Sequence, residues 1–310
     1  MRFFERHRLS ALATAALLIV ILGGAALITS AVRAEPATAD AAAAPVVPVA
    51  TDTIDLAGFE PGRILSDYSF YNAAAMTEAE IETFLQSRSC TRTDSSPCLW
   101  EYRETTTDVP AAGAGHCAAY TGAANEHASR ILSKVAEACG ISPRVLLVLL
   151  QKEQSLLSRP TESGYLRATG YGCPDTADCN ADYFGFFNQV YNAAWQFRQY
   201  TQEPDRAYKI GAVDVGYNPD AECGASTVDI QNQATANLYN YTPYQPNEAA
   251  LADPDSDGDG CSTHGNLNFW LFYTAWFGPG GTAPYPDVFD ACLNYAHGQD
   301  CRVPELIPAL

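Results

Sequence analysis

Basic residues are scarce in this chain of 310 residues, which has 18 Lys and Arg against 36 Asp and Glu and a formal net charge of −18. Nucleic acid is therefore disfavoured as a partner, because binding phosphate needs a basic surface. The same charge disfavours tight electrostatic binding to anionic wall polymers, although its main effect is solubility outside the cell. Neutral sugar rings could still be bound by stacking, for which the 17 Tyr and 4 Trp provide surface.

Histidine is also rare, with five in the chain, and none lies in a nucleophile motif such as Gly-x-Ser-x-Gly. No CxxC, Cys/His or HExxH spacing indicates a zinc site. Ser/His/Asp chemistry and zinc chemistry are therefore not supported. The sequence lacks the alternating apolar and polar pattern of long strands, so we expect a mainly α domain with loops pinned by disulfides.

The N-terminus is typical of an export signal, because basic residues precede a long apolar run at residues 9–32. Small residues around Ala34 suit signal peptidase, but the run is also long enough to span a bilayer as an uncleaved signal anchor. In both cases the bulk of the chain lies outside the cytoplasm, and a membrane is a partner only through that anchor. We divide the chain into a signal (1–34), an Ala/Pro-rich linker (35–53), a main domain (54–278) and a tail (279–310).

All ten cysteines lie in the exported part of the chain. An even number of cysteines in such a chain indicates disulfides, here five. The short separations favour pairing between neighbours in the sequence. The expected pairs are Cys90–Cys98, Cys117–Cys139, Cys173–Cys179, Cys223–Cys261 and Cys292–Cys301.

Apolar periodicity and capping residues predict six helices. The clearest start is at Thr77, which has capping-box spacing to Glu80. Gly140 is expected to end the second helix. The predicted helices cover residues 76–87, 123–139, 142–154, 189–202, 228–239 and 266–277.

The third of these helices carries the main candidate for catalysis, Glu153. Residues 145–150 are all apolar, so the helix has no polar face and is expected to be buried. Burial and the negative end of the helix dipole would both favour a protonated carboxyl at Glu153. A protonated carboxyl is what a general acid needs to cleave a glycosidic bond. The alternative is a solvated Glu that closes a core helix.

Three segments resemble, in the same order, the motifs of the lysozyme-like lytic transglycosylases. They are the helix that ends near Glu153, the segment at residues 185–189, and Leu-Tyr-Asn at residues 238–240. The departures are Gln154 in place of Ser, Asn188 inserted before Gln189, and Tyr241-Thr242-Pro243 in place of an Ala-Gly step.

A closer resemblance covers about residues 58–278 and is to secreted actinobacterial proteins with a lysozyme-like domain, often labelled haemagglutinin-like. These proteins share a lead-in of the pattern Phe-x-Pro-Gly-x-Ile-Leu/Ile-Ser-Asp, found here as Phe-Glu-Pro-Gly-Arg-Ile-Leu-Ser-Asp at residues 59–67.

The resemblance implies a lysozyme-like helical fold and a secreted enzyme that cleaves the glycan strands of peptidoglycan, with Glu153 as general acid/base and no required cofactor. The alternative is an inactive relative that binds wall glycan or a surface partner. Tyr239 is expected close to Glu153. The residues expected to contact sugar are Tyr171, Phe187, Gln189, Tyr239, Asn240 and Tyr244.

The number of carboxylates bears on the type of cleavage. A two-carboxylate hydrolase needs a second acidic residue, whereas a lytic transglycosylase can use a single Glu, which fits this sequence better. The acidic residues that could serve as a second group are Asp175, Asp178 and Asp182.

An acidic segment at residues 253–260 begins twice like an Asp-x-Asp-x-Asp-Gly calcium loop. Neither register has Glu at its twelfth position, where His264 and Asn266 stand instead. Calcium could bind here, and the alternative is a solvated acidic turn. The four carboxylates concerned are Asp253, Asp255, Asp257 and Asp259.

Overall fold

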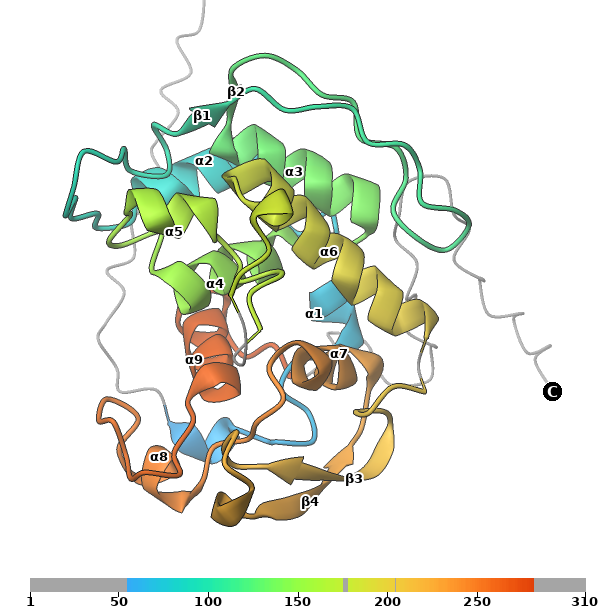
Figure 1. Cartoon of the computed structure of the whole chain (residues 1–310), viewed down its shortest axis with the longest axis vertical. Helices are drawn as coiled ribbons and strands as arrows, with labels where there is room; N and C mark the ends of the chain where they lie inside the picture. Colours follow the sequence, from blue (N-terminus) through green and yellow to red (C-terminus); the bar gives the residue numbers. More distant parts are fainter. Residues whose placement is uncertain (1–54, 175–177, 204, 282–310) are drawn as a thin grey trace, which may run out of the picture. The chain divides into compact units, whose positions relative to one another are not determined.

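The structure is a computed structural model that describes residues 55–174, 178–203 and 205–281 (Figure 1). The expected signal, the linker, the C-terminal tail beyond residue 281 and the Cys292–Cys301 pair lie outside these residues. The described part is a mainly helical domain with little strand, as the sequence predicts. None of its helices is long and apolar enough to cross a membrane.

Nine α-helices lie in the described residues, together with two antiparallel strand pairs, β1–β2 and β3–β4. The helices are α1 (Asp67–Tyr71), α2 (Glu78–Gln86), α3 (Ala128–Cys139), α4 (Pro143–Gln154), α5 (Glu162–Leu166), α6 (Phe186–Gln202), α7 (Gln233–Tyr241), α8 (Glu248–Ala252) and α9 (Gly265–Phe277). The strands are β1 (Arg103–Glu104), β2 (Glu126–His127), β3 (Gly211–Gly216) and β4 (Ala225–Ile230), and 3-10 turns cover Leu56–Gly58, Ala181–Tyr183 and Ala221–Cys223.

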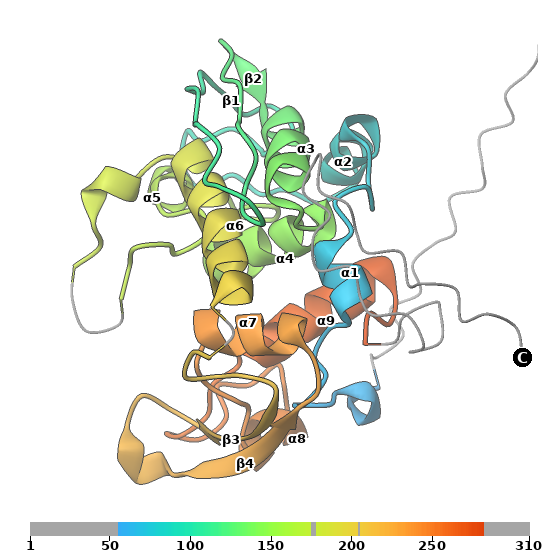
Figure 2. The ribbon, with the colours of Figure 1, turned by 90° about the vertical axis from the view of Figure 1, so that its right-hand side faces the viewer.

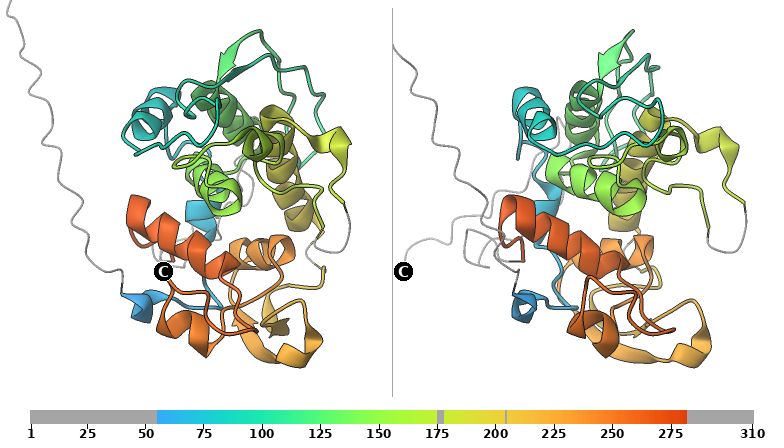
Figure 3. Two further views of the ribbon diagram at one scale, coloured as in Figure 1. Left: turned by 60° about the vertical axis from the view of Figure 1, so that its left-hand side comes forward. Right: turned by 90° about the vertical axis from the view of Figure 1, so that its left-hand side faces the viewer.

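Helix α4 runs through the core. Its residues 145–150 are at most 1% exposed, which confirms the prediction of a buried helix. It packs against α3 and α9, and Figures 1 and 3 show α9 running alongside it. Residues 145–150 are covered on all sides, and the helix becomes partly exposed again over its last residues, 151–154.

Most of the predicted helix ends agree with the structure. The capping box of Thr77 and Glu80 begins α2, and Gly140 ends α3 in a left-handed conformation with φ of 63°. Helix α3 starts only at residue 128, because Glu126 and His127 pair with β1. The helix expected over residues 228–239 is wrong in its first part, since residues 225–230 pair with β3 from Gly211 to Gly216.

The β3–β4 hairpin and β1–β2 lie at opposite ends of the helical body (Figure 2). Residues 231 and 232 separate β4 from α7, and the Asn232 side chain caps α7 by accepting a hydrogen bond from Thr235 N. The hairpin therefore leads directly into α7.

Residues 59–67, the lead-in motif, form a strap along α7. The Ile64 amide donates to Thr235 Oγ1 at 3.0 Å, and Tyr239 donates its hydroxyl to the Pro61 carbonyl at 3.0 Å. Asp67 Oδ1 accepts from Ala234 N at 2.7 Å, so a carboxylate caps the positive end of α7. The lead-in motif thus fixes the helix whose C-terminal end reaches Glu153.

The strap depends on close backbone approach at Gly62. The Gln231 amide donates to the Gly62 carbonyl at 2.9 Å, and a Cβ at residue 62 would overlap the Asp229 carbonyl oxygen. We expect Gly62→Ala to lower the free energy of unfolding by about 1–3 kcal/mol, the usual cost of overpacking. Thermal and denaturant unfolding would measure it.

Gly260→Ala is the matched control, because a Cβ there meets nothing within 4 Å. It should change the free energy of unfolding by less than about 1 kcal/mol. A small increase is expected, because alanine restricts the conformations of the unfolded chain. Equal stability of the two variants would contradict the strap's close contact.

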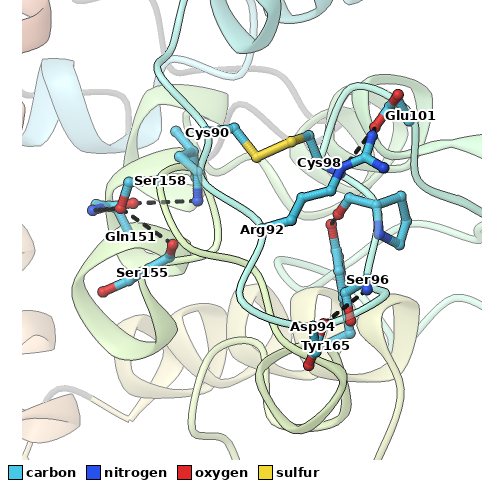
Figure 4. The surroundings of a disulfide bond; sticks show 12 residues. Cys90, Arg92, Asp94, Ser96, Cys98, Glu101, Gln151, Ser155, Ser158 and Tyr165 are labelled. Carbon is cyan, nitrogen blue, oxygen red and sulfur yellow. Dashed lines mark hydrogen bonds and ion pairs between the residues drawn. A yellow bond between two sulfur atoms is a disulfide. The ribbon is translucent and has the colours of Figure 1, made fainter.

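Four disulfides join the pairs that the short separations favour: Cys90–Cys98, Cys117–Cys139, Cys173–Cys179 and Cys223–Cys261. The Cys90–Cys98 loop is bonded to the turn after α4 and to α5. Thr91 N donates to the Ser158 carbonyl at 2.7 Å and Tyr165 donates to the Pro97 carbonyl at 2.8 Å, and Figure 4 shows this region. These disulfides indicate an extracytoplasmic protein, because cytosolic thiols are kept reduced.

Candidate functional site

The site is built at the C-terminal end of α4. Ser142 caps the start of the helix and Pro143 occupies its first turn, as predicted. The helix ends at Gln154 because Ser155 adopts a left-handed conformation with φ of 52°. Gln151 fixes the turn that follows, since its side chain donates to Ser158 Oγ and accepts from Leu157 N. Glu153 therefore projects from a rigid helix end rather than from a loop.

The Glu153 carboxylate is partly exposed and carries an ion pair that the sequence alone did not predict. Its side chain is 23% exposed, and Oε1 lies 2.6 Å from Lys152 Nζ. Lys152 is only 8% exposed, and its ammonium also donates to Thr242 Oγ1 at 3.0 Å. The positive charge of Lys152 therefore lies directly against the carboxylate of Glu153.

Gly170 closes one side of the carboxylate. A Cβ on residue 170 would lie 3.5 Å from Glu153 Oε2, and φ of +70° at this position favours glycine. The short turn around Gly170 thus brings bare backbone against Oε2. No bulky side chain at residue 170 separates this oxygen from an incoming ligand.

Gln189 holds that turn in place. Its Nε2 donates to the carbonyls of Tyr171 and Tyr183, both at 2.8 Å. Its Oε1 accepts from the amides of Thr169 and Tyr171 at 3.2 and 3.1 Å. Gln189 is fully buried, and both of its amide protons are used within the protein, so it positions the site and does not present its amide to a sugar.

Tyr241, and not Tyr239, is the tyrosine that interacts with Glu153. The Tyr241 hydroxyl donates to the Thr169 carbonyl at 2.8 Å. Burial, together with the negative charge of Glu153, raises the pKa of Tyr241 well above its ordinary value. Tyr239 is fully buried, and its hydroxyl is bonded to the strap at Pro61. The Tyr-Thr-Pro departure from the family pattern therefore supplies residues of the site itself.

Tyr171 follows Gly170 and remains partly exposed. Its ring lies at right angles to that of Tyr183, with centroids 4.8 Å apart. Burial raises the pKa of Tyr171, so its phenol is neutral at physiological pH. Tyr171 can offer an aromatic face to a sugar ring beside Glu153.

The other expected sugar-contact residues have structural roles in the described protein. Phe187 is 4% exposed and packs on Tyr120, with ring centroids 4.7 Å apart. Asn240 bonds the backbone of Tyr208 through both ends of its amide. Tyr244 is partly exposed and forms a β-bridge with Gly216. The resemblance predicted a sugar contact for each, and only Tyr244 and Asn240 retain partial exposure.

Potential second carboxylates are spread over the loop after α5. Asp178 and Asp182 are exposed, and Asp175 lies outside the described residues. Glu104 is a further carboxylate that sequence patterns did not indicate. It accepts from Phe187 N at 2.9 Å at the start of α6, and burial raises its pKa, a change that this hydrogen bond opposes. Glu104 thus stabilises the positive end of α6.

The acidic loop at residues 253–260 is held by its own hydrogen bonds. Asp259 Oδ1 accepts from Asn247 Nδ2 at 2.8 Å and from Cys261 N at 2.9 Å, and these bonds lower the pKa of Asp259. Asp253 Oδ1 accepts from Asp255 N at 3.3 Å. Within the part of the chain that the structure describes, no group of three or more His, Cys, Asp or Glu side chains is arranged to hold a metal ion.

Comparison with known proteins adds one match. Residues 63–279 match the family model described as LasA, N-terminal domain. No curated protein and no solved structure matches the chain. Proteins of the LasA family are lytic and act on the cell wall. Since the match covers most of the chain, including α4 and residues 63–67 of the strap, the chain belongs to the LasA N-terminal domain family.

Proposed function

We propose that this protein is a secreted, lysozyme-like enzyme that cleaves the glycan strands of peptidoglycan, with Glu153 as its general acid/base. The observation that carries the proposal is the placement of one partly exposed carboxylate at the rigid end of a buried helix. The bare backbone of Gly170 lies against this carboxylate, and Tyr171 follows Gly170 in the chain.

One carboxyl group is sufficient for this chemistry. Glu153 Oε2 would give its proton to the bridging oxygen of the glycosidic bond, and the bond to the anomeric carbon would break. The carboxylate would then take the proton of the muramic 6-hydroxyl as that oxygen attacks the anomeric carbon, which yields an anhydro end. Attack by water in place of that hydroxyl would yield a hydrolysed end.

A second candidate function is wall-glycan binding without cleavage, and the Lys152–Glu153 ion pair is the observation that favours it. An ammonium at 2.6 Å stabilises the carboxylate, whereas the first step of cleavage needs the protonated acid. A binding protein has no such requirement. The partly exposed rings of Tyr171 and Tyr244 could bind sugar in either kind of protein.

Mass spectrometry of purified peptidoglycan after incubation with the protein separates the two functions. An enzyme releases glycan fragments with new reducing or anhydro ends. A binding protein sediments with the wall and leaves the strand length unchanged. If the protein sediments with the wall and releases no fragments, the enzyme proposal is wrong and the second function is supported.

We further propose that calcium, where it binds the acidic loop, acts on stability and not on cleavage. The missing twelfth-position Glu predicts weak affinity, about 10⁻⁴–10⁻³ M. Calcium at ten times its Kd should stabilise the fold by about 1.4 kcal/mol and raise the Tm. Cleavage should continue in chelator, because none of the Glu153 contacts involves this loop. Loss of cleavage in chelator that calcium restores would contradict this expectation.

A further inference from the structure

The two oxygens of the Glu153 carboxylate have different surroundings. Oε1 is held by the Lys152 ammonium at 2.6 Å. Oε2 faces Gly170, where even an added Cβ would remain 3.5 Å away. A carboxylate held through one oxygen keeps the other in a defined direction, so the ion pair fixes Oε2 beside the backbone of Gly170.

Lys152 is itself fixed by parts of the chain that are distant in sequence. Thr242, just after α7, accepts its hydrogen bond at 3.0 Å. Gly265 begins α9, and a Cβ on it would lie 3.7 Å from Nζ and crowd the Thr242 methyl group. The Lys152 side chain is 8% exposed. Its ammonium lies among Glu153, Thr242 and the start of α9 and does not extend into water.

Three phenols surround this pair in the part of the chain that the structure describes. Tyr241 interacts with Glu153, and Tyr171 and Tyr200 interact with Tyr241, but burial raises the pKa of all three phenols. His264 precedes Gly265 at the start of α9, so its imidazole is included in the test below.

We propose that Lys152 is a positioning residue of the catalytic site. It holds Glu153 Oε1, leaves Oε2 as the oxygen that exchanges the proton, and stabilises the carboxylate formed when that proton is donated. The inference rests on the proposed glycan cleavage and adds a second residue to it. Glu153 remains the catalytic group, because Lys152 acts only through it.

The test compares Lys152→Met with wild type over a range of pH. In the pH profile of kcat/KM, activity falls on the alkaline side as the general acid loses its proton. The positive charge of Lys152 favours the ionised form of Glu153, so its loss should move this alkaline limb to higher pH by about one unit. The value of kcat should fall about tenfold, since a weaker acid donates its proton less readily. Lys152→Arg keeps the charge and should leave the limb in place. His264→Gln should also leave it, which excludes His264 as its source.

Carbon-13 NMR titration of the Glu153 carboxyl, assigned by its absence in Glu153→Gln, gives a readout that needs no activity. The midpoint should rise in Lys152→Met at an unchanged fold, as judged by Tm. An unchanged midpoint and an unchanged limb would overturn the inference while the enzyme still cleaves glycan. A raised midpoint in a protein that cleaves no glycan would instead overturn the proposed function.

Discussion

Replacing Glu153 with Gln should slow glycan cleavage by a factor on the order of 10²–10⁴, the range typical of losing a general acid. The two side chains are nearly isosteric, and the Gln oxygen can still accept the hydrogen bond of Lys152. The amide cannot donate a proton to the bridging oxygen. Initial rates of fragment release from purified peptidoglycan would measure the loss, and Tm would establish that the fold is kept.

Glu60→Gln is the matched control for this substitution. Glu60 is exposed and lies in the strap, so the same loss of one carboxylate there should leave the rate unchanged. Unchanged fragment release by the Glu153 variant would show that this residue is a structural Glu at the end of a core helix.

Removing the Cys223–Cys261 disulfide by a double Cys→Ser change should lower the free energy of unfolding by roughly 4 kcal/mol. The bond closes a loop with a sequence separation of 38, so it restricts the unfolded chain strongly. It also joins the turn between β3 and β4 to the end of the acidic loop. Denaturant unfolding under oxidising conditions would measure the change.

The Cys173–Cys179 disulfide provides a matched comparison, because its cysteines are likewise partly exposed. Its separation is only 6, and the same double change should lower the free energy of unfolding by roughly 2 kcal/mol. A larger loss from Cys173–Cys179 than from Cys223–Cys261 would show that loop length does not govern their contributions.

Local sequence signals predicted much of the helical framework. The Ser-Pro start and uninterrupted apolar run of α4 require a buried helix, and the Thr77–Glu80 capping box fixes the start of α2. These features depend on residues within one turn of each other. The four described disulfides were equally predictable from the sequence, because each joins cysteines that are neighbours along the chain.

The β3–β4 hairpin was missed because its pattern is short and shared with helices. Val228 and Ile230 alternate with polar residues over only a few positions, and apolar residues continue into α7. Pairing with β3 decides the conformation of residues 225–230. Asn232, which caps α7, was the local sign that the helix begins later.

The roles of site residues depended on contacts between distant segments. Gln189 was expected to face a sugar, but the turn around Gly170 uses its entire amide. The sequence analysis assigned no role to Lys152, whose ammonium contacts Glu153 and the distant Thr242 in the structure. No pattern within a single helix reports which distant backbone groups will surround a side chain.

The most direct test of the central claim is mass spectrometry of peptidoglycan strands incubated in ¹⁸O-labelled water with wild type, Glu153→Gln or Glu60→Gln. We predict shortened strands with wild type and Glu60→Gln, and intact strands with Glu153→Gln over the same period. Unlabelled anhydro ends would identify transglycosylation, and labelled reducing ends would identify hydrolysis. Strands that remain intact with the folded wild-type protein, or that are shortened equally by Glu153→Gln, would contradict the assignment of Glu153 as the general acid/base.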